Sequence, residues 1–308
     1  MLNEQRLLRI SISATVVVAT FGIVLGLLSG SFSIAFDGVY SLGDAGMTAL
    51  ALWISSLIVR SAQHEKPYGK LHGRFTMGFW HLEPIVLLLN GTLLIAVAVY
   101  ALINAVSNIL EGGHELRFDY AIIYAAITVV ICLAMAWLEA RANRRLQSDF
   151  IALDVRAWIM SGGITLALLI AFVTGYAVKG TPLDWITPYV DPVALALVCV
   201  VIIPLPIGTV RQALSDILLI APTELKIHVD QVAAETIERH GFLSHRAYVA
   251  RVGRAIQIEI YFIVPRGQHP KAIDEWDRIR DEVGRAIGEE GHDRWLTIAF
   301  TGNVAWAE

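Results

Sequence analysis

Six long apolar segments constrain this chain more than any other feature. They cover roughly residues 9–29, 33–59, 76–110, 118–140, 150–177 and 189–215. A helix needs roughly 20 mostly apolar residues to cross a bilayer, and each segment is long enough. The charged residues agree, because 27 fall in residues 1–220 and 25 in the much shorter stretch 221–308. The sequence predicts a six-helix transmembrane domain over 1–220 and a water-soluble domain over 221–308.

Basic residues in the connecting loops predict the orientation. The loops on one side carry most of the Lys and Arg residues, namely Arg6, Arg9, Arg60, Lys66, Lys70, Arg74, Arg141, Arg144 and Arg145. The loops on the other side carry only Arg117 and Lys179. Because Lys and Arg accumulate on the cytoplasmic side, we expect an integral protein of the plasma membrane, or of a bacterial inner membrane, with both termini in the cytoplasm.

The soluble part alternates helical and strand patterns. Helices are expected over 223–240 and 270–288, and strands over 246–251, 254–264 and 295–300. In the second helix, one apolar face is formed by Ile273, Trp276, Ile279, Val283 and Ile287. The order α-β-β-α-β predicts a small two-layer α+β domain with its own modest core. The fold class is therefore an α-helical membrane protein followed by a cytoplasmic α+β domain.

A short internal repeat places carboxylates within or near the predicted spans. Residues 31–46 (SFSIAFDGVYSLGDAG) match residues 148–163 (SDFIALDVRAWIMSGG) at an offset of 117, which pairs Asp37 with Asp154. Acidic residues inside a membrane are costly and mark ion or proton pathways. Nearer the water interface, Asp37 and Asp154 would instead cap or brace helix ends.

Helical spacing predicts that these acids share one polar seam. Asp37 and Asp44 are seven residues apart and lie two turns apart on one face, with Tyr40 and Ser41 between them. If the second and fifth spans pack together, Asp154 and Ser161 join the same seam. Small residues would allow the helices to approach closely, namely Gly38, Gly43, Gly46, Gly162 and Gly163.

Several function classes are disfavoured by composition. The two cysteines, Cys132 and Cys199, lie in apolar runs and are too few for a disulfide framework or a Cys-rich metal site. The net charge is −4 and there is no basic block, so nucleic acid is an unsuitable partner. The chain contains no HExxH, Ser–His–Asp or Gly-rich phosphate motif, so an enzyme is not expected.

Three stretches resemble the cation diffusion facilitator family. They are SFSIAFDGVYSLGD (31–44), GFWHLEP (78–84) and RQALSDILLIAP (211–222). The resemblance covers nearly the whole chain. It implies a homodimer that exchanges cytosolic divalent cations (zinc, cobalt, cadmium, iron or manganese) for protons, with a tail that resembles a metallochaperone and helps dimerisation. The cation is then the transported substrate, and no prosthetic group is expected.

The transport-site positions depart from the family pattern. The paired ligands of the second span read Tyr40 and Asp44 here, and those of the fifth span read Ala157 and Ser161. Only Asp44 is a strong donor at these positions, so Asp37 and Asp154 are recruited or transport is altered or lost. We therefore take Asp44, Tyr40, Asp37 and Asp154 as candidate metal ligands. An all-oxygen site favours manganese or magnesium over zinc and leaves zinc open.

Further polar residues and two prolines lie within or beside the predicted spans. The loop from Arg60 to Arg74 holds His64, Glu65 and His72, which indicate either an ion access route or simple positive-inside anchoring. Arg156 lies beside Asp154 and would neutralise it. Glu139 is expected in a cytoplasmic-side ion pair. Asn90 and Asn104 are expected to bond between helices, and Pro204 with Pro206 to interrupt the sixth span.

The tail lacks the ligands that the family often carries there. Its last strand reads LTIAFTGN, and Trp276 stands where a helix His is common. Its histidines match no metal motif: His228, His240, His245, His269 and His292. Two functions follow for the whole chain: a proton-coupled divalent-cation transporter working by alternating access, or a non-transporting scaffold or heterodimer partner that kept the fold. The costly acids favour the transporter.

Overall fold

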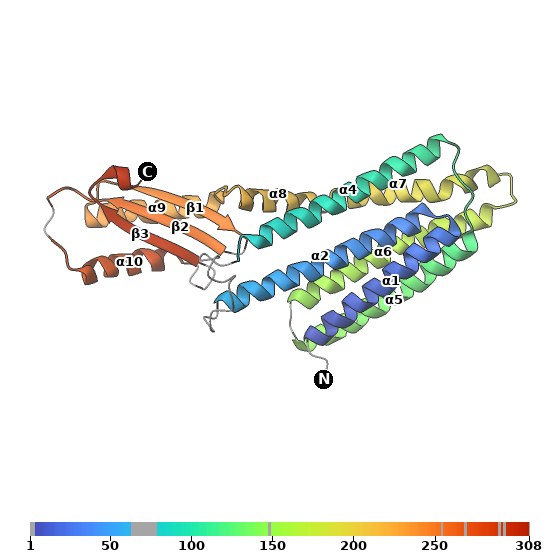
Figure 1. Ribbon diagram of the computed structural model, residues 1–308, viewed down its shortest axis with the longest axis horizontal. Helices are drawn as coiled ribbons and strands as arrows, with labels where there is room; N and C mark the ends of the chain where they lie inside the picture. Colours follow the sequence, from blue (N-terminus) through green and yellow to red (C-terminus); the bar gives the residue numbers. More distant parts are fainter. Residues whose placement is uncertain are drawn as a thin grey trace, which may run out of the picture. The chain divides into compact units, whose positions relative to one another are not determined.

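The computed structural model describes residues 4–62, 79–146, 149–253, 255–267, 270–288, 291 and 294–307. The long helices are α1 (Glu4–Ser29), α2 (Phe32–Ala62), α4 (Leu82–Leu110), α5 (Phe118–Leu146) and α6 (Asp149–Val178), shown in Figure 1. A 3-10 helix η1 (Asp184–Tyr189) leads into α7 (Val190–Ile202) and α8 (Ile207–Ile217). The tail follows with α9 (Thr223–His240), β1 (Ser244–Val252), β2 (Ala255–Ile263), α10 (Ile273–Ile287), β3 (Arg294–Thr301) and η2 (Val304–Trp306).

The predicted spans are present. Within the described part of the chain, six segments are long and apolar enough to cross a membrane: Arg9–Ser29, Phe32–Ile58, Leu82–Leu110, Phe118–Arg144, Asp154–Val178 and Asp184–Ile217. Many of their large apolar side chains are exposed, as with Val17, Leu27 and Leu110, which suits contact with lipid. The third helix begins at Leu82 rather than at residue 76, because residues 79–81 form a turn and Pro84 fits the first helical turn.

The sixth span is broken, as its two prolines predict. The helix α7 ends at Ile202, and residues 203–206 form a turn before α8 begins at Ile207. Neither Pro204 nor Pro206 has a backbone N–H to continue the helical ladder. The loop from Arg60 to Arg74 lies outside the described residues from position 63 onward.

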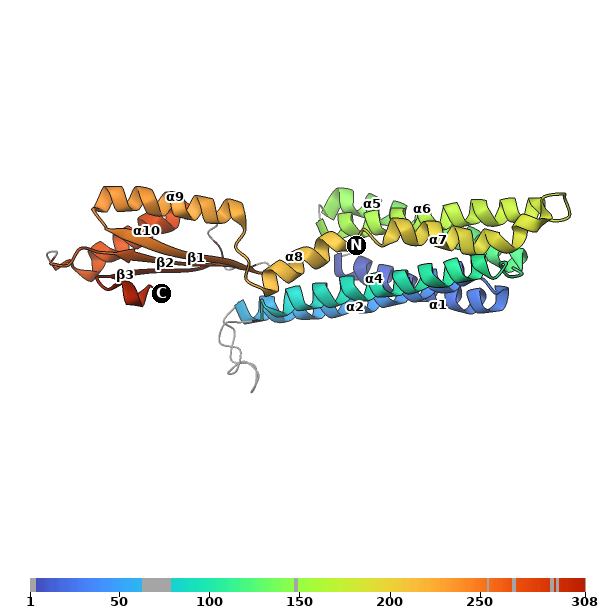
Figure 2. The ribbon, with the colours of Figure 1, turned by 90° about the horizontal axis from the view of Figure 1, so that it is seen from above.

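The chain divides into two compact units, residues 1–49 with 90–208 and residues 50–89 with 209–308. In the first unit, α1, α5 and α6 lie side by side, and α7 packs against α6 (Figures 1 and 2). Its core includes Ile34, Tyr124 and Phe172. The boundary near residue 220, expected from charge density, stays a prediction.

Glycines bring α1 and α2 together. A Cβ at Gly38 would lie 2.6 Å from the Ala19 carbonyl oxygen, and one at Gly26 would lie 2.5 Å from the Ala35 nitrogen. Only a glycine allows such a close approach of two backbones. The expectation for Gly43, Gly46 and Gly163 is wrong, because a Cβ there meets nothing within 4 Å.

The tail has the predicted α-β-β-α-β order. Its sheet has the strand order β1-β2-β3; β1 and β2 are antiparallel, and β2 and β3 are parallel with α10 between them in sequence. Both helices lie on one side of the sheet (Figure 2). Val229, Ile258 and Val283 are fully buried between the layers. The expectation for Ile273 is wrong, since it is 75% exposed in the first turn of α10.

Candidate functional site

The polar seam of α2 opens into a cavity within the first unit. Helical spacing places Asp37, Tyr40, Ser41 and Asp44 along one face of α2, and all four line this cavity of about 280 Å³. Other polar residues of its wall are Ser11 and Thr15 from α1, Thr48 from α2, and Asp154 and Ser161 from α6. The structure thus brings together all six side chains that the repeat and the spacing predicted for one seam.

Asp37 is held by a residue far away in the sequence. The hydroxyl of Tyr124 on α5 donates a hydrogen bond to Asp37 Oδ2 at 2.8 Å, and Tyr124 is fully buried. A Cβ at Gly22 would lie 2.7 Å from that hydroxyl, so the glycine leaves room for the contact. Asp37 therefore braces α2 against α5 while it lines the cavity.

Asp44 and Tyr40 form the centre of the candidate site. The side chain of Asn90 on α4 hydrogen-bonds to Asp44, which makes Asn90 the expected interhelical partner. The expectation for Asn104 is wrong, because its amide donates to the Tyr100 carbonyl oxygen within α4 at 3.1 Å. The Tyr40 ring packs against Phe36 with ring centroids 5.6 Å apart.

The expected second ligand pair falls on Ala157 and Ser161 of α6, where the side chains offer one hydroxyl oxygen and no nitrogen. Both Ala157 and Ser161 line the cavity, so the two sequence positions do face α2. The Ser161 hydroxyl oxygen lies 3.8 Å from Cys132 Sγ. Across the described residues, no group of three or more His, Cys, Asp or Glu side chains is placed to hold a metal ion. Candidate donors therefore lie around the cavity without forming a closed carboxylate cage.

Asp154 has an acidic neighbour rather than a basic one. Arg156 is exposed, and no ion pair between these two residues is present among the described side chains. Asp154 instead interacts with Glu139 of α5. The ion pair expected for Glu139 is wrong for the described part of the chain, because Glu139 is completely buried and both carboxylate oxygens lack a hydrogen-bond partner there.

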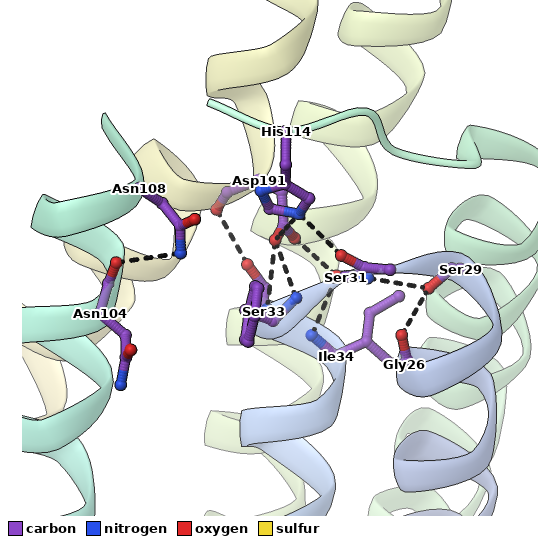
Figure 3. A network of polar contacts seen from close by, with 11 residues as sticks. Gly26, Ser29, Ser31, Ser33, Ile34, Asn104, Asn108, His114 and Asp191 are labelled. Carbon is purple, nitrogen blue, oxygen red and sulfur yellow. Dashed lines mark hydrogen bonds and ion pairs between the residues drawn. The ribbon is translucent and has the colours of Figure 1, made fainter. Parts of the chain in front are cut away.

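The start of α2 is fixed by a carboxylate from α7. Figure 3 shows Asp191 accepting a hydrogen bond from the Ser31 hydroxyl at 2.5 Å, and its other oxygen accepts from the Phe32 N–H at 2.9 Å. The Ser33 hydroxyl donates to the Asp191 carbonyl oxygen at 2.9 Å. Asp191 is 1% exposed. A buried carboxylate at the N-terminal end of a helix accepts hydrogen bonds from N–H groups that have no partner within the helix. Its negative charge is also stabilised by the positive end of the helix dipole.

His114 joins the same network from the loop between α4 and α5. Its Nε2 lies 2.7 Å from the Gly30 carbonyl oxygen and 3.7 Å from Asp191 Oδ2 (Figure 3). The turn between α1 and α2, this loop and the start of α7 therefore meet at Asp191. The network sets where α2 begins, and so sets the height of Tyr40 and Asp44 along the bundle.

The tail histidines take part in local contacts. His228 Nε2 lies 3.2 Å from the carbonyl oxygens of Ala286 and Ile287, and His240 Nε2 lies 3.4 Å from Glu282. His245 Nε2 lies 3.3 Å from Asp230. His269 and His292 lie outside the described residues. The described histidines thus contact carbonyl and single carboxylate groups rather than one another.

The pKa values of two tail side chains, His240 and Asp230, are lowered. Burial lowers the pKa of His240, and the nearby charges of Lys271 and Arg239 lower it further. Burial raises the pKa of Asp230, but hydrogen bonds from Lys226 and His245 outweigh this and hold it below its usual range. Both shifts therefore favour the form that carries no bound proton.

Sequence reasoning missed the roles of Tyr124, Asp191 and Glu139. Tyr124 and Asp191 bond to residues 87 and 159 positions away, respectively, and no local pattern reports such a contact. One signal was available, since Asp191 and Glu139 are acids within or beside apolar spans, which is unusual.

Comparison with known proteins agrees with this architecture. Residues 8–218 match the cation efflux transmembrane domain. The magnetosome protein MamB of Paramagnetospirillum magneticum is 26% identical over 285 residues, covering 90% of this chain and 87% of MamB. The zinc transporter ZitB of Pectobacterium atrosepticum is 25% identical over 74% of this chain and 66% of ZitB.

A shorter match is to the human probable proton-coupled zinc antiporter SLC30A4. The two sequences are 29% identical over 126 residues, which is 40% of this chain and 27% of SLC30A4. The domain match covers more than half of the chain, and the six apolar helices make it an integral membrane protein. The chain therefore belongs to the cation diffusion facilitator family, whose members are metal-cation efflux transporters and not enzymes.

Proposed function

We propose that this chain exports a divalent metal cation in exchange for protons, and that the cavity between α1, α2 and α6 is its transport site. One observation carries the proposal: the cavity gathers Asp37, Tyr40, Asp44 and Asp154 between apolar helices. Carboxylates in such a position are expensive to keep and typically mark an ion pathway. Membership of a cation efflux family supports the same direction of function.

The ligand set is built on Asp44 and Tyr40, with Asp37 and Asp154 as the further carboxylates of the cavity. All of these side chains offer oxygen, which suits hard divalent cations such as manganese. Zinc is supported from another direction, because two relatives are named as zinc transporters. Zinc, cobalt, cadmium, iron and manganese therefore all belong in the test.

Carboxylate ligands also suit exchange with protons. A proton and a metal ion compete for the same oxygens, so release of one favours binding of the other. The proposed cycle alternates access of the cavity between the two sides of the membrane, in a homodimer with both termini in the cytoplasm. The match to a relative named as a proton-coupled antiporter supports the coupling.

The test is metal flux into proteoliposomes containing the full chain, with each ion supplied singly. Asp44→Ala removes the central carboxylate, and Asp119→Asn is the control because Asp119 is exposed in the first turn of α5 and outside the cavity. We expect flux of at least one ion in the wild type and the control, and loss of that flux in Asp44→Ala. Equal flux in Asp44→Ala, or no flux of any ion from folded protein, would contradict the proposal.

A further inference from the structure

Glu139 is a buried acid that neither the fold nor the proposed transport site explains. It lies on α5, its side chain is 0% exposed, and neither carboxylate oxygen has a hydrogen-bond partner in the described residues. A carboxylate removed from water is costly unless donors or a cation satisfy its oxygens. The two Glu139 carboxylate oxygens are therefore candidates to bind a cation.

The side chains around Glu139 are oxygen-bearing or polar. Asp154 and Trp158 of α6 and Ser11 of α1 are its polar neighbours, although none of them reaches its oxygens with hydrogen-bond geometry. Trp158 Nε1 donates a hydrogen bond to Ser11 Oγ at 2.8 Å, and both residues are nearly buried. This bond fixes the Ser11 oxygen beside the two carboxyl groups. The neighbours place one hydroxyl and two acids in a single small region.

The ion pairs found among the described residues include neither Glu139 nor Asp154. Arg141, two residues after Glu139 and so on another face of α5, lies over the Trp137 ring at 5.5 Å, and Trp137 is 65% exposed. Two carboxylates that face each other without a counter-charge repel, and a divalent cation between them removes that repulsion.

One member of the pair, Asp154, lines the cavity, and Glu139 lies behind it. Ser11, Asp154 and Trp158 line the same cavity as Tyr40 and Asp44. Glu139 lies near the end of α5, Asp154 near the start of α6 and Ser11 in the early part of α1, so the three occupy the end of the bundle where α1 begins. Asp44 lies farther along the bundle on α2. An ion that arrives from the α1 end would meet Asp154 before Asp44.

We propose that Glu139 and Asp154, with the Ser11 hydroxyl, form a second cation-binding site that takes a hard divalent ion before it reaches Tyr40 and Asp44. The ligands are two carboxylates and a hydroxyl, so the site favours manganese-like ions over soft ones. Its role as a staging position rests on the proposed transport function. Its ability to bind an ion does not.

The experiment counts manganese ions bound to the purified full-length protein at equilibrium, using the electron paramagnetic resonance signal of free Mn²⁺. Glu139→Gln removes the charge and keeps the shape. We expect it to bind about one Mn²⁺ fewer per chain than the wild type. Asp154→Asn removes a carboxylate that also lines the proposed transport cavity, so it should lose at least one. Asp44→Ala should lose a different ion, so Glu139→Gln combined with Asp44→Ala should lose two. Glu111→Gln is the control, because Glu111 is exposed at the far end of α4.

The possible results distinguish failure of the second site from failure of the transport proposal. Unchanged Mn²⁺ binding in folded Glu139→Gln and Asp154→Asn overturns the second site and means that the acids only share a proton. That result leaves the transport proposal intact if Asp44→Ala still abolishes flux. Conversely, loss of one Mn²⁺ in Glu139→Gln from a protein that carries no flux supports the second site and contradicts transport. If Glu139→Gln fails to fold, Asp154→Asn should still lose Mn²⁺, and Glu139→Asp, which keeps a carboxylate, should retain the wild-type count.

Discussion

At the scale of single residues, the polar lining of the cavity consists mainly of side-chain oxygen atoms. Spacing alone predicted that Asp37, Tyr40 and Asp44 share a face, because a helix repeats its faces in a fixed way. Spacing did not predict that Tyr124 would hold Asp37, since that contact closes only when α5 packs against the bundle. The acid at 154 was predicted, but its neighbour Glu139 was assigned to an ion pair that the described residues do not contain.

Restoring a nitrogen ligand should change the metal preference. Ala157→His places an imidazole on the cavity wall, where zinc binds nitrogen well and manganese gains less. We expect zinc binding to strengthen about tenfold relative to manganese, the scale of change that metal-site residues commonly produce. Ile159→His is the matched control, because Ile159 lies on the same helix outside the cavity wall and is exposed. Isothermal titration should show equal effects of both variants only if position 157 does not face the bound ion.

At the scale of helices and strands, sequence patterns predicted most of the structure. The apolar runs gave the six spans, and the alternation of Ile258 and Ile260 with polar residues gave the buried face of β2. Patterns failed where a residue distant in the sequence fixes the start of a helix, as Asp191 does for α2. They also failed in the first turn of α10, where Ile273 follows the apolar spacing but is exposed.

The Asp191 network should be a major determinant of membrane-domain stability. Asp191→Ala removes the acceptor of the Ser31 hydroxyl and the Phe32 N–H, and each unsatisfied buried donor costs about 1–3 kcal/mol. We expect the melting temperature of the full-length protein to fall by several degrees, at roughly 2–4 °C per kcal/mol. Asp184→Ala, an exposed acid on η1, should change it little. Equal melting temperatures for the two variants would rule out the capping role.

The pKa of His240 makes the stability of the tail depend on pH. Because its folded pKa lies below the unfolded value near 6.5, the unfolded chain binds the proton more tightly, and stability falls as pH drops through 6.5 towards the folded pKa. Asp230 does not contribute in this window, since its effect is lost only below its own unfolded pKa near 3.8. The protection factors of the Gly241 and Phe242 amides, obtained by dividing the base-catalysed intrinsic exchange rate at each pH by the observed rate, should be higher at pH 7.5 than at pH 5.5 in the full-length protein. His240→Gln should flatten that difference, and a difference that persists in the variant would assign it to another group.

For the whole molecule, the family relationship and the six-helix fold both support metal-cation efflux. The domain match spans 8–218, and the match to MamB extends through most of the tail as well. Composition predicted the membrane class, because charged residues are sparse before residue 221 and dense after it. Composition cannot name the ion, since selectivity depends on which oxygens surround it, and that depends on packing between distant helices.

The central claim is that metal ions and protons use the same cavity. The most direct measurement follows both at once, in proteoliposomes without an imposed pH gradient and with a pH-sensitive dye in the lumen. Adding the transported ion outside should bring metal in and drive protons out, so the lumen becomes alkaline, and Asp44→Ala should abolish both signals together while Asp119→Asn retains both. Metal uptake without a pH change, or proton movement that survives in Asp44→Ala, would contradict the account.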